Sequence, residues 1–175
     1  SRDMEEVLVD SEDGYRLAKE SMRMLTPSHA KRVKRYRDGD TPLFSHFRVE
    51  DQINAIHNHT VRLKAGGYIV IDQTEALVSI DVNSGRSTRE RNIEETALRT
   101  NLEAADEIAR QLRLRDMAGL IVIDFIDMDE QCNCSKVEKR IKEALKTDRA
   151  RIQIGRISAF GLLEMSRQRL RESNV

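Results

Sequence analysis

The sequence of 175 residues has no tryptophan, only two cysteines and no excess charge of either sign. Lysine plus arginine and aspartate plus glutamate both number 30, so overall charge gives no argument for a nucleic-acid partner, and any such argument must come from local patches. Without tryptophan, the core must be mainly aliphatic. No run of about 18 apolar residues and no signal peptide are present. We therefore expect a cytoplasmic protein of one domain with a small appendage.

Several familiar site motifs are also missing. Cys132 and Cys134 form a Cys-x-Cys pair in a predicted loop, but a tetrahedral zinc site needs four ligands and no partner pair exists, so we expect free thiols. His57-Asn58-His59 is a contiguous string at the predicted end of a helix, which is not a nuclease motif. There is no phosphate-cradling glycine loop and no Gly-x-Ser-x-Gly elbow. The sequence begins inside a predicted strand, so we expect a fragment of a longer protein.

What is present is a strand–helix–strand pattern in the middle of the chain. Ala76–Asn83 and Gly119–Asp127 are apolar runs rich in β-branched residues, and a helical pattern from about Ile93 to Arg115 separates them. This arrangement predicts a right-handed βαβ unit with two parallel strands. Because both runs are almost continuously apolar, we expect both faces of the sheet to be covered.

Asp81 and Asp124 lie at or near the carboxyl ends of these two strands. If the strands are neighbours, their spacing of about 4.8 Å brings both carboxylates within reach of one divalent ion. Mg²⁺ favours one or two carboxylates with water and phosphate oxygens. The pattern therefore indicates a Mg²⁺ or Mn²⁺ site that handles phosphate. The alternative is that the two aspartates only cap loops or the next helix.

Other polar residues surround this predicted site. Asn83 would share a face with Asp81 and either orients that carboxylate or starts the following turn. Arg86 follows in a loop, where it either grips substrate phosphate or is ordinary surface. Asp127 would face the opposite side if its strand continues, so we place it outside the site.

The rest of the chain predicts a mixed α/β fold. Ser11 should cap a helix to about Leu25, whereas the basic stretch Lys31–Arg37 either touches phosphates or, as we favour, is a solvated helix face. The other expected elements are a helix at Val49–His57, an antiparallel meander of Val61–Leu63, Tyr68–Ile71 and the Ala76 strand, a capping box at Asn92 and Glu95, a helix from Ser135 to Lys146, strands at Arg151–Ile154 and Phe160–Met165, and a basic tail containing Arg167, Arg169 and Arg171.

Specific strings of the chain resemble the bacterial ribonuclease E/G family. They cover nearly the whole sequence, and their wording is closest to the ribonuclease E branch; they are Asp72–Arg86, Thr100–Ala105, Arg110–Arg115, Gly119–Met128 and Phe160–Arg169. The resemblance implies a deoxyribonuclease-I-like catalytic subdomain at 57–175, preceded at 1–56 by part of a ribonuclease-H-like subdomain.

The resemblance also implies site residues. Asp81 and Asp124 match the two magnesium-binding catalytic aspartates of the family, and Asn83 matches the residue that orients the first of them. Arg151 matches an arginine near the pocket that senses an RNA 5′ monophosphate. The implied reaction is Mg²⁺-dependent hydrolysis of single-stranded, AU-rich RNA that leaves 5′-phosphate ends, in RNA processing and mRNA decay.

Further features of the family concern the whole protein. The full-length proteins of the family form homo-oligomers through a zinc-binding Cys-Pro-x-Cys link, which this chain lacks. The resemblance also implies that the parent protein joins RNA-degradation proteins and can lie on the inner face of the cell membrane. Its OB-fold and 5′-sensing domains are missing here as well. Two alternatives therefore stay open: an inactive fragment that binds RNA or serves assembly, and a different phosphate-handling enzyme such as a phosphatase.

Overall fold

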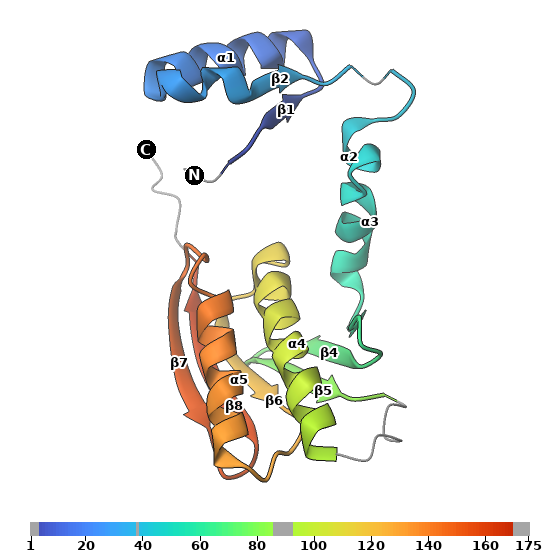
Figure 1. The fold of residues 1–175 in the computed structure, drawn as a ribbon, viewed down its shortest axis with the longest axis vertical. Coiled ribbons are helices and arrows are strands. Elements are labelled where there is room, and N and C mark those ends of the chain that lie inside the picture. The colour runs from blue at the N-terminus through green and yellow to red at the C-terminus, as the bar shows by residue number, and fades with distance from the viewer. Residues whose placement is uncertain (1–3, 38, 86–92, 170–175) are drawn as a thin grey trace. The chain divides into compact units, whose positions relative to one another are not determined.

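The computed structural model describes residues 4–37, 39–85 and 93–169 of the chain (Figure 1). The chain divides into two compact units, which we call unit 1 (Ser1–Ala55) and unit 2 (Ile56–Val175). In the part of the chain that is described, no helix combines the length and hydrophobicity that crossing a membrane requires.

Unit 1 is built around a short parallel pair of strands and one amphipathic helix. Ser11 accepts a hydrogen bond from the backbone N–H of Gly14 at 3.1 Å, so the predicted N-cap of the first helix is confirmed. The elements of this unit are β1 (Val7–Val9), α1 (Glu12–Leu25), η1 (Pro27–Arg32), β2 (Val33–Arg35), α2 (Leu43–His46) and α3 (Val49–Asn54). The short η2 (Ala55–His57) follows α3 and spans the boundary between the two units.

The basic stretch Lys31–Arg37 is not the solvated helix face that we favoured. Its first residues end η1, and the next three form β2, which pairs with β1 in parallel register from Val7 opposite Val33. Val33 is buried in this pairing, which explains why an apolar residue interrupts the run of charges. Four charges of the stretch therefore lie on a 3₁₀ helix and a strand, and the fifth, that of Arg37, follows the strand.

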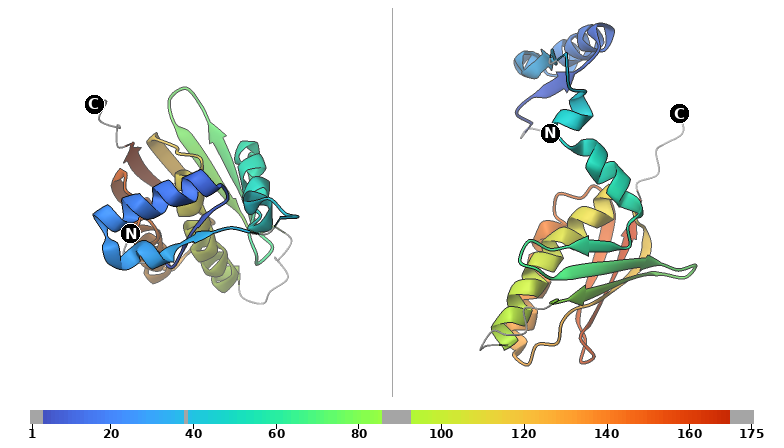
Figure 2. Two further views of the ribbon diagram at one scale, coloured as in Figure 1. Left: turned by 90° about the horizontal axis from the view of Figure 1, so that it is seen from above. Right: turned by 90° about the vertical axis from the view of Figure 1, so that its right-hand side faces the viewer.

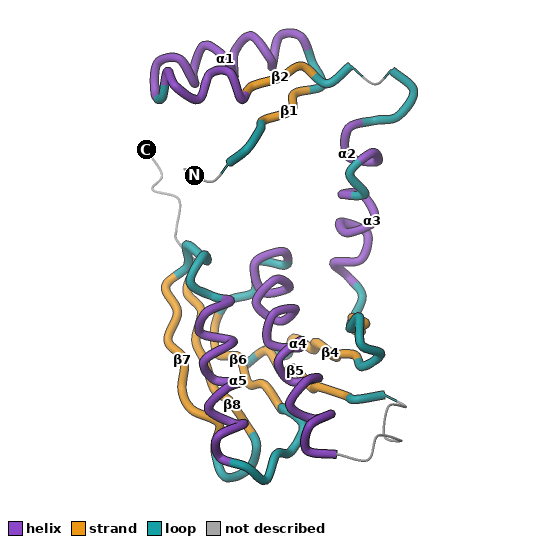
Figure 3. The backbone as a smooth tube through the Cα atoms, in the orientation of Figure 1, coloured by secondary structure: helices purple, strands orange, loops and turns teal. Residues whose placement is uncertain are grey.

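Unit 2 is a six-stranded mixed sheet with two helices, α4 and α5, on one of its faces (Figures 1 and 2). The strand order is β3-β4-β5-β6-β8-β7, with one parallel pair, β5 and β6, among antiparallel neighbours. Figure 3 shows the strands in orange and the helices in purple. The elements are β3 (Thr60–Arg62), β4 (Tyr68–Gln73), β5 (Val78–Asn83), α4 (Ile93–Leu114), β6 (Gly119–Asp124), α5 (Gln131–Ala144), β7 (Arg151–Ile157) and β8 (Leu162–Gln168).

The core lies between the sheet and the two helices. Every second strand residue points into it, as in Val78, Ile80 and Val82 of β5, while Ser79 and Asp81 between them are exposed. The helices contribute fully buried residues, which include Ala104, Ala105, Ile108, Leu112, Val137 and Ile141. Within the described part of unit 2, no helix lies on the second face, so this unit by itself does not cover both faces of its sheet as we expected.

The predicted meander and the parallel β5–β6 pair are confirmed. The strand β8 lies between β6 and β7 and pairs antiparallel with both. Helix α5 begins at Gln131, four residues before the start that we predicted at Ser135, and the Ser135 hydroxyl donates a hydrogen bond to the Gln131 carbonyl inside the helix. The predicted cap residue Asn92 lies outside the described residues.

Candidate functional site

Two aspartates stand side by side at the ends of the parallel pair. Asp81 in β5 is in register with Asp124 in β6, and both side chains lie on the face of the sheet away from the helices. Neighbouring strands are about 4.8 Å apart, so the two carboxylates can reach a common ion. Asn83 donates a hydrogen bond from Nδ2 to Oδ2 of Asp81 at 2.9 Å, which holds that carboxylate in one orientation.

The electrostatics of this pair favour a cation. Partial burial, and then the negative charges of Asp81 and Asp127, raise the pKa of Asp124 above its ordinary value. A bound divalent ion would remove this cost. Among the described residues, no group of three or more His, Cys, Asp or Glu gathers at metal-binding spacing. The donor set is thus two carboxylates open to solvent, which is the arrangement that leaves Mg²⁺ its waters and phosphate ligands.

Asp127 lies closer to the site than the sequence indicated. We expected it to face the other side of the sheet if its strand continued, but β6 ends at Asp124 and Asp127 belongs to the loop that follows. Its charge acts on Asp124, and its Oδ1 lies 3.0 Å from the position that a Cβ on Gly161 would take. Because Phe125 and Ile126 are apolar like the strand residues before them, the sequence did not show that the strand ends at Asp124.

Helix α4 holds the loop that follows Asp124 at two points. The buried Asn101 side chain accepts a hydrogen bond from Ile126 N–H at 3.0 Å and donates one to Ile126 carbonyl at 2.8 Å. Further along, the Glu94 carboxylate accepts from the N–H groups of Asp129 and Glu130, at 2.9 and 3.2 Å. Together with a hydrogen bond from the Asn133 side chain, these contacts lower the pKa of Glu94.

The two arginines proposed for phosphate binding are not both near this pair. Arg151 opens β7 and pairs with Gln168, whereas Asp124 pairs with Leu162 at the other end of β8. Six residues of strand, about 20 Å, separate these two rungs of the sheet. Arg86 lies outside the described residues.

The cysteines also differ from their predicted setting. Cys132 and Cys134 are free, and they lie in the first turn of α5 rather than in a loop. Positions two apart on a helix project in different directions, so the pair does not converge on one ion. Burial is the main cause that raises the pKa of the Cys134 thiol, which makes it a poor metal ligand or nucleophile.

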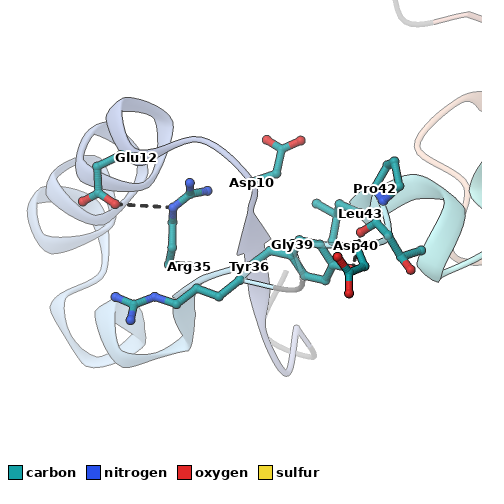
Figure 4. A pocket seen from close by; sticks show the side chains of 10 residues that line it. Asp10, Glu12, Arg35, Tyr36, Gly39, Asp40, Pro42 and Leu43 are labelled. Carbon is teal, nitrogen blue, oxygen red and sulfur yellow. Dashed lines mark hydrogen bonds and ion pairs between the residues drawn. The ribbon is translucent and has the colours of Figure 1, made fainter.

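Unit 1 contains a separate hollow of about 620 Å³ (Figure 4). Its wall includes Arg35, Tyr36 and Asp40, together with Asp10 and Glu12. Arg35 is already engaged there, in an ion pair with Glu12 at 3.4 Å and a hydrogen bond to the Val9 carbonyl at 3.1 Å. Three carboxylates, of Asp10, Glu12 and Asp40, and two arginines, Arg35 and Arg37, line this hollow, so its mixed charges do not point to a strongly anionic or strongly cationic ligand.

Comparison with known proteins gives close relatives along the whole chain. The model of the Ribonuclease E/G family matches residues 1–170. The chain is 60% identical to Ribonuclease E of Haemophilus influenzae over 98% of its own length and 18% of that protein. It is 56% identical to Ribonuclease E and 40% identical to Ribonuclease G of Escherichia coli, again over 98% of its length, and covers 16% and 35% of them. The chain thus spans between about a sixth and a third of these relatives.

Proposed function

Because the chain belongs to the ribonuclease E/G family, we propose that unit 2 carries the metal-dependent catalytic site of an endoribonuclease. The observation that supports this most directly is the register of Asp81 with Asp124, with Asn83 hydrogen-bonded to Asp81. No protein nucleophile is needed for such a reaction. We also propose that residues 57–175 form a deoxyribonuclease-I-like subdomain and that residues 1–56 form part of a ribonuclease-H-like subdomain.

Each residue of the site has a distinct task. Asp81 and Asp124 would hold one Mg²⁺, or Mn²⁺ in its place. Asn83 keeps the Asp81 carboxylate from rotating and so holds it ready for such an ion. When bound, the ion would activate water and stabilise negative charge on the phosphate. The open face of the sheet leaves room for a polynucleotide to approach both carboxylates.

We propose single-stranded, AU-rich RNA as the substrate and 5′-phosphate ends as the products, in RNA processing and decay. The support is the family membership and a site suited to phosphate bound through a divalent ion. Assembly with further copies and with RNA-degradation proteins would be a property of the whole protein. Since the chain covers under a fifth of the ribonuclease E relatives, an RNA-binding fragment without catalysis is the competing proposal.

Cleavage of a 5′-monophosphorylated, AU-rich RNA oligonucleotide with Mg²⁺ and with EDTA tests the proposal. We expect Asp81→Asn and Asp124→Asn to reduce the Mg²⁺-dependent rate to the level seen with EDTA. Asn83→Ala should retain a rate about 10 to 100 times lower than the unaltered protein, because it leaves both ligands in place. Asp72→Asn is the matched control, since Asp72 is an exposed aspartate on β4 of the same sheet.

Three results would contradict the proposal in different ways. Unchanged cleavage in both Asp81→Asn and Asp124→Asn would remove the active-site assignment. Binding of the RNA without any Mg²⁺-dependent cleavage would favour the RNA-binding fragment. Hydrolysis of a small phosphomonoester with none of RNA would favour a phosphatase.

A further inference from the structure

We propose that Tyr68 and Arg62 form a subsite next to the carboxylate pair that binds one nucleotide of the RNA strand. The base would stack on the Tyr68 ring, and the Arg62 guanidinium would pair with a phosphate. This inference rests on the proposed function, because it assigns the substrate a second point of attachment beside the same site.

The strand register places these side chains on one face. Arg62 in β3 is opposite Tyr68 in β4, and Tyr68 is opposite Asn83 in β5. Directly opposite residues point to the same face of a sheet, so all three share the open face with Asp81. Tyr68 and Asp81 are diagonal neighbours on adjacent strands. Two residues in this relation lie about 7 to 8 Å apart, a distance that one nucleotide can span.

A pocket of about 450 Å³ lies at this position. The volume falls in the range of ligand-binding pockets in proteins. Its lining consists of Thr60, Arg62, Leu63, Gly66, Gly67, Tyr68 and Gly85. Apolar, aromatic and cationic groups thus surround one space, as recognition of a base together with its phosphate requires.

Glycines keep one wall of this pocket bare. Gly85 has a φ of +64°, and a Cβ there would lie 2.6 Å from the Gly66 carbonyl oxygen. A Cβ on Gly67 would lie 2.6 Å from the Asn83 carbonyl oxygen. The β3–β4 turn can therefore approach the end of β5 only with glycine at these positions. This close approach fixes Tyr68 beside Asn83.

The two side chains remain available to a ligand. Tyr68 is half-buried, and its hydroxyl forms no hydrogen bond with any residue in the described ranges. Arg62 is exposed and has no ion pair within those ranges. Stacking on an aromatic ring is tolerant of base identity, and arginine binds phosphate through paired N–H groups. The aromatic and cationic groups next to the carboxylate pair therefore favour a nucleotide over an acidic peptide, which offers no base to stack.

Steady-state cleavage kinetics separate a binding role from a structural one. We expect Tyr68→Ala to raise KM about tenfold, and Tyr68→Phe, which keeps the ring, to restore it. Arg62→Gln should raise KM and reduce the slope of log affinity against log salt by about one, because one phosphate contact is lost. Arg156→Gln is the control, since Arg156 is an exposed arginine of β7, the edge strand at the opposite end of the sheet from β3.

A binding measurement gives a result even where nothing is cleaved. The probe is a short single-stranded RNA with 2-aminopurine at one position at a time, added to the Asp81→Asn protein. Stacking on Tyr68 should quench the fluorescence at one position, and the added Tyr68→Ala change should remove that quenching.

The two measurements together keep this subsite and the proposed activity apart. Position-specific quenching that depends on Tyr68, without cleavage by the unaltered chain, would support the subsite and contradict the activity. Cleavage with an unchanged KM in Tyr68→Ala, or quenching that is independent of Tyr68, would overturn the subsite and leave the activity intact.

Discussion

Arg167 is the one arginine or lysine that is buried among the described residues, with 5% of its surface exposed. It donates two hydrogen bonds to the Asp148 carboxylate, at 2.8 and 3.2 Å. A third goes to the Met117 carbonyl at 2.8 Å and a fourth to Asp116 at 3.1 Å. All three nitrogens and four of the five N–H groups of the guanidinium thus donate hydrogen bonds, and such pairing is what makes burying this charge tolerable.

We predicted from the sequence that Arg167 lies in a basic tail, and that prediction is wrong. The residue alternates with Leu163 and Met165, so it points to the helix-covered face of β8. If the predicted strand is extended to Gln168, the sequence already shows that Arg167 occupies the same alternating position as Leu163 and Met165. The partner was not visible, because Asp148 lies 19 residues earlier, just before β7.

The buried pair predicts how stability depends on pH. Burial alone would raise the pKa of Asp148, but hydrogen bonds from Arg167 and from Ala150 N–H, with the positive charges nearby, outweigh it and lower the pKa. A carboxylate with a lowered pKa in the folded state stabilises the protein above its unfolded pKa of about 3.9. That contribution is lost as the pH falls through the lower folded pKa.

Urea unfolding of Asp148→Asn between pH 3 and 7 measures this contribution. At pH 7 we expect a loss of about 3 kcal/mol, because the buried guanidinium loses its ion pair. The difference from the unaltered protein should shrink as the pH falls below about 4. Asp116→Asn is the control: Asp116 also contacts Arg167 but is exposed, so its loss should be under about 1 kcal/mol. A pH-independent loss in Asp148→Asn would contradict the argument.

At the level of elements, the parallel strands and the position of their aspartates were predictable from local pattern alone. Two apolar runs, a helix-length segment between them and a carboxylate near the end of each run define the β5–β6 pair and its register. The insertion of β8 between β6 and β7 was not predictable in this way. Pairing between strands that are distant in sequence depends on which edge of the growing sheet is still unpaired. The residues of β8 do not indicate which strand they pair with.

The polar contacts behind the site were missed for a related reason. Asn101 interrupts the apolar stripe of α4 and looked like an ordinary helix residue, but it is fully buried against Ile126. Its amide pairs with both backbone groups of that residue, as a neighbouring strand would. A polar residue at an inward-facing helix position is the signal that could have identified it.

This contact predicts that Asn101 controls the position of the loop after Asp124. Asn101→Ala removes these partners from the N–H and C=O of the partly buried Ile126, so we expect a loss of about 2 kcal/mol in the free energy of unfolding. The loop should also exchange its amide hydrogens faster than α4. Hydrogen-exchange measurements resolved along the chain test this, with Thr100→Ala as a control at the neighbouring buried position. Unchanged protection of residues 125–128 would show that the loop does not depend on Asn101.

Across the whole molecule, the apolar core is unevenly divided. The contiguous cluster of buried residues runs from Leu63 to Met165 and belongs entirely to unit 2. In the described part of unit 1, Ala30 and Val33 are the only buried hydrophobic residues. Leu17, Met24 and Leu25 of α1 are more than 60% exposed. Burial of apolar surface is the main stabilising term in folding, so the two units should differ strongly in their own stability.

We therefore predict that the chain from Ile56 onward folds alone and that residues 1–55 do not. Urea unfolding of 56–175, followed by circular dichroism, should give one cooperative transition with the midpoint of the full chain, and the separate 1–55 peptide should give none. Core substitutions provide the matched test. Ile80→Ala should lower the free energy of this transition by about 3 kcal/mol, whereas Val33→Ala should leave it unchanged. A transition that moves with Val33→Ala would show that unit 1 unfolds together with unit 2 and contributes to its stability.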